Sequence, residues 1–295
     1  MRRFLSIVKA TALEILSEPL SLLVLLAALV LTVFAPAFHY HQFGEATRMA
    51  RDAGLSSVFT CGALIAIFGT IRSFRREIES GTMSMALAHP VSRTDFFLAK
   101  ALGAFTAYLV FVLVVLLTSL VIVDGAAIGG AIARQSGDVA RLYGPSLAQG
   151  VGVIVLPLVL AAALNRFARM RFVLSSFALA FSLSLVCAAL SAVRDAVWIL
   201  RLLPVAILLV LFSAVLLSAS AAFAVRLRAN AAASAAGGVF LLALPAVGNY
   251  YMSDALSNGG SVPWGYVGLA ALAALPAVLL FLILGSHFIN GRDIS

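Results

Sequence analysis

The stretch AFTAYLVFVLVVLLTSLVIV, residues 104–123, holds no charged residue in 20 positions. A helix of that length rises about 30 Å, which matches the hydrocarbon thickness of a bilayer. The apolar residues run continuously and do not alternate with polar ones. The stretch therefore predicts a membrane-spanning helix and not a strand of a membrane barrel.

Apolar stretches of this kind recur along the whole chain. Of the 295 residues, 63% are hydrophobic and 11% are charged, and the mean hydropathy is +1.10, whereas a soluble domain has about 25% charged residues. This composition excludes a water-soluble enzyme and a disordered chain. It predicts an all-α polytopic membrane protein, in one domain over residues 1–295. Eight spans are expected, at residues 19–38, 55–74, 104–123, 146–164, 172–193, 203–225, 235–252 and 265–288.

The number of spans depends on one pair. If residues 146–164 and 172–193 form a re-entrant or interfacial hairpin, six spans remain. Arg166, Arg169 and Arg171 lie between the two and favour a cytoplasmic turn, hence eight spans. The polar residues 39–54 and the glycine-rich residues 124–144 are expected to be loops, the second with room for a short surface helix.

The first 18 residues are expected to form an amphipathic helix in the cytoplasmic interface. Lys9, Glu14 and Glu18 interrupt any signal-peptide core. One helical face is apolar, and it contains Phe4, Leu5, Val8, Ala12, Ile15 and Leu16. The alternative is a polar leader that merges into the first span.

The net charge is +8 and the pI is about 10.2. Most lysines and arginines fall in the segments that become cytoplasmic when both termini are placed inside, as the positive-inside rule requires. The positive charge therefore indicates contact with anionic lipid in the bilayer and does not indicate nucleic-acid binding.

Several chemical signatures are missing from the sequence. No ionisable residue lies in the middle of a predicted span, which disfavours an ion-coupled carrier, although Na⁺ coupling through carbonyls and hydroxyls stays open. There is no phosphate-binding GxxxxGK[ST] motif, no GxSxG and no HExxH. The chain is therefore expected to have no catalytic site and no cofactor of its own, and any energy for transport would come from another polypeptide.

The metal-ligating residues form no cluster in the sequence. His39 and His41 make an HxH pair that could bind copper or zinc with a third ligand from Glu45 or Met49, but an interfacial belt of His and Tyr is the favoured explanation. Cys61 and Cys187 both fall inside predicted spans. No metal site is therefore assigned, and His39 and His41 are the candidates.

The most informative segment is RREIESGTMSMALAHPVSRTDFFLAK, residues 75–100. Gly81 should break a first helix, and Thr82 can cap a second one. Pro90 should stop that helix, and Ser92, Thr94 or Asp95 can cap the helix that enters the third span. The result is a rigid elbow that could transmit force from a docked partner into two spans. The alternative is a passive loop on the membrane surface.

The residues Glu79-Ser80-Gly81-Thr82, Pro90-Val91-Ser92-Arg93 and Lys100 with Gly103 resemble the E-x-G-T, P-x-S-R and K-x-x-G motifs of ATP-binding-cassette permeases of the ABC-2 exporter type. The likeness is greatest to permeases of the multi-copper-enzyme maturation and gliding-motility groups. The family core usually has six spans, and the chain has no large outer insertion. The resemblance implies a cytoplasmic coupling helix within residues 75–103 that binds a partner through Glu77, Glu79, Gly81, Thr82, Pro90, Ser92, Arg93 and Lys100.

The resemblance implies the membrane-spanning permease subunit of an exporter in the bacterial inner membrane. An ABC ATPase subunit would bind ATP and Mg²⁺, and two permeases would pair as a homodimer or heterodimer. The alternatives are a non-transporting membrane anchor or assembly factor for a soluble partner, and an ion-coupled secondary transporter. The transported substrate has no signature in the sequence.

Overall fold

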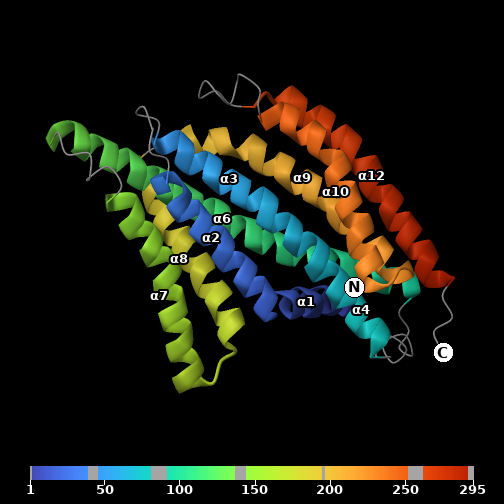
Figure 1. The fold of residues 1–295 in the computed structure, drawn as a ribbon. Coiled ribbons are helices and arrows are strands. Elements are labelled where there is room, and N and C mark those ends of the chain that lie inside the picture. The colour runs from blue at the N-terminus through green and yellow to red at the C-terminus, as the bar shows by residue number, and fades with distance from the viewer. Residues whose placement is uncertain are drawn as a thin grey trace. The chain divides into compact units, whose positions relative to one another are not determined.

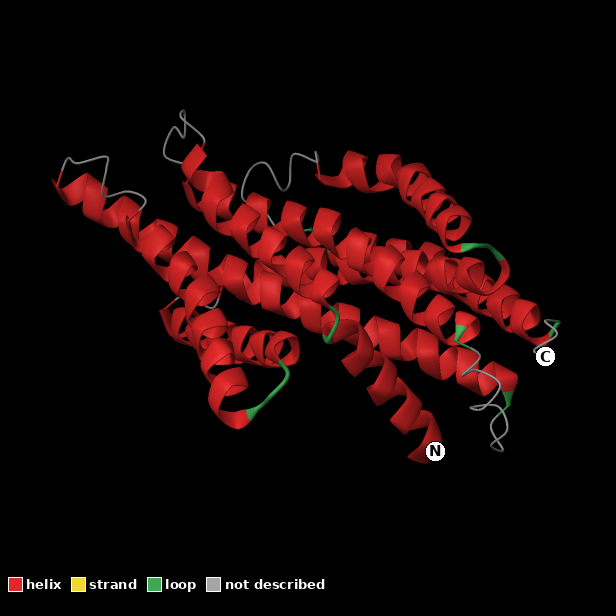
Figure 2. Cartoon of the chain, turned by 60° about the horizontal axis from the view of Figure 1, so that its bottom comes forward, coloured by secondary structure: helices red, strands yellow, loops and turns green. Residues whose placement is uncertain are grey.

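The computed structural model describes residues 2–38, 46–80, 92–136, 144–194, 197–251 and 262–291. Nearly all of these residues are helical, and no strand occurs among them (Figure 2). The predicted all-α class is therefore confirmed. The long apolar stretches form helices because a helix satisfies every backbone polar group within its own segment.

The helices follow the predicted spans closely (Figure 1). In chain order they are α1 (Arg2–Leu16), α2 (Pro19–Phe38), α3 (Ala46–Leu64), the π-helix η1 (Ile65–Gly69), α4 (Thr70–Glu79), α6 (Arg93–Ser136), α7 (Gly144–Ala168), α8 (Phe172–Arg194), α9 (Val197–Arg226), α10 (Ala229–Tyr251) and α12 (Trp264–Asn290). Almost all of each predicted span lies within helix.

Among the described residues, six helices are long and apolar enough to cross a membrane on their own. They are Thr47–Glu79, Arg93–Ile132, Gly144–Ala168, Phe172–Ser191, Leu202–Arg226 and Trp264–Asn290. Counting α1 and Pro19–Phe34 as one broken span gives seven, and Ala229–Ala243 is a shorter apolar helix. The structure thus supports a polytopic membrane protein with at least six candidate spans.

Two predicted loops are wrong in part. Residues 39–54 were expected to be a loop, but α3 begins at Ala46. Arg48 and Asp52 stand one helical turn apart with 3.9 Å between Nε and Oδ2, and Asp52 also pairs with the buried Arg51 at 3.0 Å. The pair one turn apart is of the kind that stabilises a helix, so the charges in this segment do not mark a loop.

The second wrong loop is residues 124–144, because α6 continues to Ser136. At least one glycine there, Gly125, is a site of close packing. A Cβ atom on Gly125 would collide with Gln149 Oε1 and lie 2.7 Å from Ser146 Cα. Glycine at this position lets the start of α7 approach the α6 backbone, which a pattern of residue types alone does not reveal.

The chain forms two compact units, each made of separate segments. The first contains Met1–Ile15, Ala63–Leu109 and Arg201–Ser295, and the second contains Leu16–Gly62 and Val110–Leu200. In the first unit α10 packs against η1 and α4, and in the second α7 runs along α8 while α2 contacts both (Figure 1). The assignment of residues 1–295 to a single permease domain stays a prediction.

Candidate functional site

The candidate site lies in the first unit, where α4 ends and α6 begins. The helix α4 stops at Glu79, and the backbone N–H of Ser80 donates to the Arg76 carbonyl at 3.0 Å. The helix α6 begins at Arg93, and the Ser92 hydroxyl accepts a hydrogen bond from the Asp95 N–H at 3.0 Å. The predicted break after Glu79 and the predicted cap at Ser92 are confirmed.

Three of the predicted partner-binding residues, Gly81, Thr82 and Pro90, fall in residues 81–91, outside the described part of the chain. The predicted second helix, between Thr82 and Pro90, falls there as well. The flanking residues are described, and they show how the two ends of this segment are held.

Lys100 is the most buried of the predicted site residues that the structure describes. Its Nζ lies 2.7 Å from Glu77 Oε1, and its side chain is 1% exposed. The same ammonium lies 5.5 Å from the centre of the Phe74 ring, which adds a cation–π contact. A carboxylate on α4 and an ammonium on α6 thus join the two helices that flank residues 81–91.

The helix α1 supplies a second carboxylate to this cluster. Glu14 Oε2 lies 4.0 Å from Lys100 Nζ and accepts a hydrogen bond from the Ser73 hydroxyl at 3.2 Å. Glu14 Oε1 lies 3.8 Å from an Arg76 guanidinium nitrogen. Two acidic and two basic side chains therefore meet where α1, α4 and α6 come together, and their formal charges cancel. We call Glu14, Ser73, Arg76, Glu77 and Lys100 the Lys100 cluster.

A close contact between backbones lies one turn away from this cluster. A Cβ atom on Gly103 would lie 2.7 Å from both Thr11 Cβ and the Val8 carbonyl oxygen of α1. Lys100 and Gly103 stand three residues apart on α6, and Thr11 and Glu14 stand three apart on α1, so each pair lies on one face of its helix. Both positions of the K-x-x-G motif therefore contact α1.

Lys100 lies inside the helix that enters the third predicted span, as the cap at Ser92 requires. The helix begins seven residues earlier, at Arg93, and Lys100 is buried inside it. A lysine stem is apolar, and its charge is balanced here by Glu77 and Glu14, so the helix can bury it. Lys100 and Glu77 are thus paired with each other within the chain.

Arg75, which pairs with Glu79, and Arg93 link the two ends of the segment to other parts of the first unit. Arg75 donates to Glu79 at 2.6 Å and to the Leu227 carbonyl at 3.4 Å, between α9 and α10. Arg93 donates to the carbonyl of Asn290, at the end of α12, at 3.4 Å. These contacts lie at or near the surface and are individually weak, but they fix where the segment leaves and re-enters the unit.

The sequence did not reveal the roles of Glu14, Ser73 and Phe74. Glu14 lies in a helix that was expected at the membrane surface, where a carboxylate needs no partner. A usable signal was present, since Ser73 and Glu77 stand four residues apart and Lys100 lies in an otherwise apolar stretch. The π-helix η1 also precedes α4, with Ile65, Ala66, Ile67 and Gly69 buried, and such turns are frequent near functional sites.

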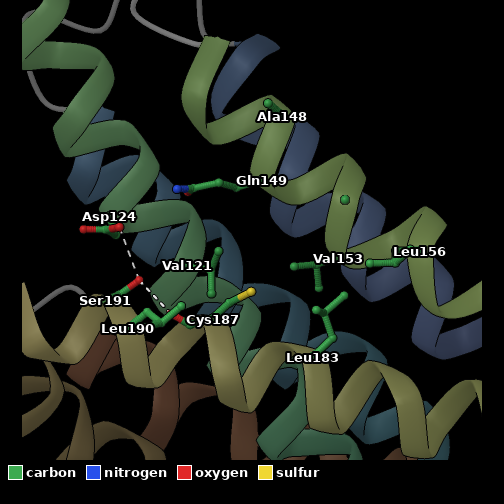
Figure 3. Close-up of a pocket in the computed structure, with 11 residues that line it drawn as sticks. Val121, Asp124, Ala148, Gln149, Val153, Leu156, Leu183, Cys187, Leu190 and Ser191 are labelled. Carbon is green, nitrogen blue, oxygen red and sulfur yellow. Dashed lines mark hydrogen bonds between the residues drawn. The ribbon is translucent and has the colours of Figure 1, made fainter.

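The second unit contains a separate cavity of about 320 Å³ between α6, α7 and α8 (Figure 3). Its walls are mostly apolar, and they include Val121, Val153, Leu156 and Leu183. At one end the Ser191 hydroxyl donates to Asp124 at 3.2 Å, as Figure 3 shows. The volume of the cavity suits a small molecule or part of a lipid chain. Among the described residues that line the cavity, only Asp124 carries a carboxylate.

The candidate metal ligands His39 and His41 lie outside the described residues. Across the described ranges, no three His, Cys, Asp or Glu residues are grouped so that they could hold a metal ion. Cys61 and Cys187 are free thiols.

Comparison with known proteins identifies the family. The family model for the ABC-2 family transporter protein matches residues 17–188, which is more than half of the chain. No curated protein and no solved structure matches the chain. The match begins after α1 and includes the whole segment between α4 and α6 together with its flanking helices. The chain belongs to the ABC-2 family of transporter membrane proteins and is a permease component of an ABC transporter.

Proposed function

We propose that this permease works as an exporter subunit driven by ATP hydrolysis in a separate ABC ATPase subunit. Membership of the family supports association with such a subunit. The observation that supports our proposal most is the Lys100 cluster, which joins α1, α4 and α6 at the base of residues 81–91. A docking segment needs a rigid base if its displacement is to move helices.

In this mechanism the ATPase subunit binds residues 81–91 and shifts them when it binds and hydrolyses ATP. Because Lys100 is paired with Glu77 across the two flanking helices, a force on the segment moves α4 and α6 together. The contact of Glu14 with the same lysine adds α1 to this group. A partner that binds two conformations with different affinity is sufficient to shift the balance between them.

The rest of the assembly follows from the same proposal. Two permeases pair with two ATPase subunits in the bacterial inner membrane, with both termini in the cytoplasm. ATP and Mg²⁺ bind in the ATPase subunits, and this chain contributes no catalytic residue. Gly81, Thr82 and Pro90 belong to the surface that the ATPase subunit contacts, whereas Lys100 and Glu77 hold that surface in place. The resemblance to the copper-enzyme maturation and gliding-motility groups stays a prediction.

The test is purification of the tagged protein from its native membranes in mild detergent, followed by identification of co-eluting chains and an ATPase assay. We expect a stoichiometric ATPase subunit whose activity is inhibited by vanadate. The variant Gly81→Asp should lose this subunit and keep its own elution profile. A matched control is Arg48→Gln, which removes a partly exposed charge in the second unit and should keep the subunit.

Three outcomes separate the candidates. Loss of the ATPase subunit in Gly81→Asp supports the coupling role. A well-folded chain that elutes alone and shows no ATPase activity would contradict the proposal. An associated ATPase whose activity responds to no exported compound would favour a membrane anchor.

A further inference from the structure

The end of α7 and the three residues that join it to α8, residues 165–171 together, have the sequence NRFARMR. This segment is tightly folded, because Asn165 Nδ2 donates to the Met170 carbonyl at 2.7 Å and the Met170 N–H donates to the Leu164 carbonyl at 3.4 Å. All seven residues are exposed. We call residues 165–171 the arginine turn.

The arginine turn presents two kinds of side chain that rarely share a water-exposed loop. Arg166, Arg169 and Arg171 supply three positive charges, while Phe167 is 87% exposed and Met170 is 51% exposed. Residues 144–194, which form the whole α7–α8 hairpin, contain no aspartate or glutamate. Within the described part of the chain, none of the three arginines forms an ion pair, so their charge is available to an outside partner.

The backbone at Arg169 supports a role for its charge. Its φ is 54°, in the left-handed region. That conformation costs free energy for any residue with a Cβ atom, and glycine adopts it freely. Glycine would be more stable than arginine at this exposed position. The arginine side chain is therefore not there to stabilise the turn, which indicates a role in binding.

The length of α7 places this turn at a definite depth. Its 25 residues rise about 37 Å, whereas the hydrocarbon core is about 30 Å thick and the bilayer with headgroups is about 40–45 Å thick. If α7 spans the membrane, the arginine turn lies at the level of the lipid phosphates. Phe167 and Met170 can then enter the acyl boundary, where aromatic side chains are favoured.

We propose that the arginine turn is a binding site for the phosphate headgroups of anionic phospholipids. The guanidinium groups match phosphate oxygens in bidentate geometry, and the exposed Phe167 and Met170 favour a lipid over a soluble acidic protein. Attraction to an anionic leaflet raises affinity about fivefold for each arginine near its surface. This site is separate from the Lys100 cluster and does not depend on the proposed ATPase coupling.

A single tryptophan placed in the arginine turn can report which lipid occupies the site. The chain contains two tryptophans, Trp198 and Trp264, and both are replaced by phenylalanine in the full-length protein carrying Phe167→Trp. The protein is reconstituted in phosphatidylcholine vesicles containing brominated phosphatidylglycerol or brominated phosphatidylcholine. Quenching of the fluorescence of the introduced tryptophan gives the relative binding constant. We expect phosphatidylglycerol to be preferred by about fivefold or more.

Two variants distinguish the effect of the arginine charges on lipid preference from the effect of a change in the structure of the turn. Adding Arg166→Gln, Arg169→Gly and Arg171→Gln should reduce the preference to about onefold. Arg169→Gly alone should lower the preference while leaving the unfolding temperature unchanged or raised, since glycine suits its backbone. The control Arg228→Gln changes an exposed arginine between α9 and α10, far from the reporter in sequence, and should leave the preference unchanged.

The possible outcomes are distinct. Equal quenching by the two brominated lipids, or a preference that survives the triple change, overturns the proposal. In that case the turn becomes a candidate docking surface for a soluble acidic partner. If millimolar glycerol phosphate abolishes the preference, the site recognises free phosphate and the lipid assignment is wrong. A preference that withstands glycerol phosphate and weakens in high salt supports the proposal.

Discussion

Lys100 Nζ lies 2.7 Å from Glu77 Oε1, and the lysine side chain is 1% exposed. The pair joins the end of α4 to the first part of α6, on either side of residues 81–91, which we propose bind the ATPase subunit. Glu14 of α1 completes the cluster. The helix α1 therefore contacts the same two helices that flank residues 81–91. We expect a displacement of that segment to displace α1 as well.

Removal of the lysine charge should destabilise the first unit. In Lys100→Met, Glu77 and Glu14 lose the charge that balances them, and breaking one partner of a buried pair costs about 3–5 kcal/mol. Because the Glu77 side chain is 30% exposed, we expect a cost at the lower end of that range. The measurement is the free energy of unfolding in mixed detergent micelles.

The double variant Lys100→Met with Glu77→Gln separates this electrostatic cost from lost packing. It removes both charges of the close pair and should recover more than half of the lost stability. If the double variant is no more stable than Lys100→Met, the stabilisation comes from packing of the lysine stem and not from charge.

Introducing a side chain at Gly103 should push α1 away from α6. In Gly103→Ala the new Cβ would lie 2.7 Å from the Val8 carbonyl oxygen, and a backbone atom cannot rotate aside. We expect a loss of about 1–3 kcal/mol and faster amide exchange in α1. The control Gly237→Ala places a Cβ where no atom lies within 4 Å and should be neutral or stabilising by up to about 1 kcal/mol. Equal effects at the two positions would contradict the close contact.

The local features at the two ends of residues 81–91 could be predicted from the sequence. A break after Glu79 and a cap at Ser92 depend on residues a few positions apart, and both are confirmed by the structure. The spans could also be predicted locally. A long apolar segment in a membrane forms a helix because its backbone N–H and C=O groups must be paired within the segment.

The predictions that were wrong concern residues whose positions depend on contacts with distant parts of the sequence. Gly125 was expected to lie in a loop, but it lies in α6 and lets α7 pack closely against that helix. Glu14 was expected to be a surface charge, but its carboxylate lies 4.0 Å from Lys100 Nζ. Arg51 lies in a stretch that was expected to be a loop, yet it is buried within α3 beside Asp52. A single sequence gives the charge of each residue but does not show which residue it pairs with. Charged residues that form ion pairs were therefore expected in a loop or at the membrane surface.

The buried hydrogen bond between the Tyr108 and Ser213 hydroxyls gives an asymmetric prediction. Both side chains are buried in the first unit, and Ser213 also donates to the Leu209 carbonyl. Ser213→Ala leaves the Tyr108 hydroxyl without this partner and should cost about 1–3 kcal/mol, whereas Tyr108→Phe leaves Ser213 bonded and should cost about 0.5–1.5 kcal/mol. Comparing unfolding free energies of the two variants checks the order, and the reverse order would mean that Tyr108 has another partner.

Charge reversal at Arg93 should impair coupling and leave the fold intact. The exposed guanidinium donates to the Asn290 carbonyl at 3.4 Å, so Arg93→Glu loses this bond and places a carboxylate near a carbonyl oxygen at the end of α12. We expect the unfolding temperature to stay close to that of the parent, because exposed contacts contribute little, while retention of the ATPase subunit falls severalfold in a mild-detergent pull-down. Arg93→Lys keeps the charge and should retain most of the partner. If Arg93→Glu keeps a full complement of ATPase with normal turnover, Arg93 has no part in the coupling surface.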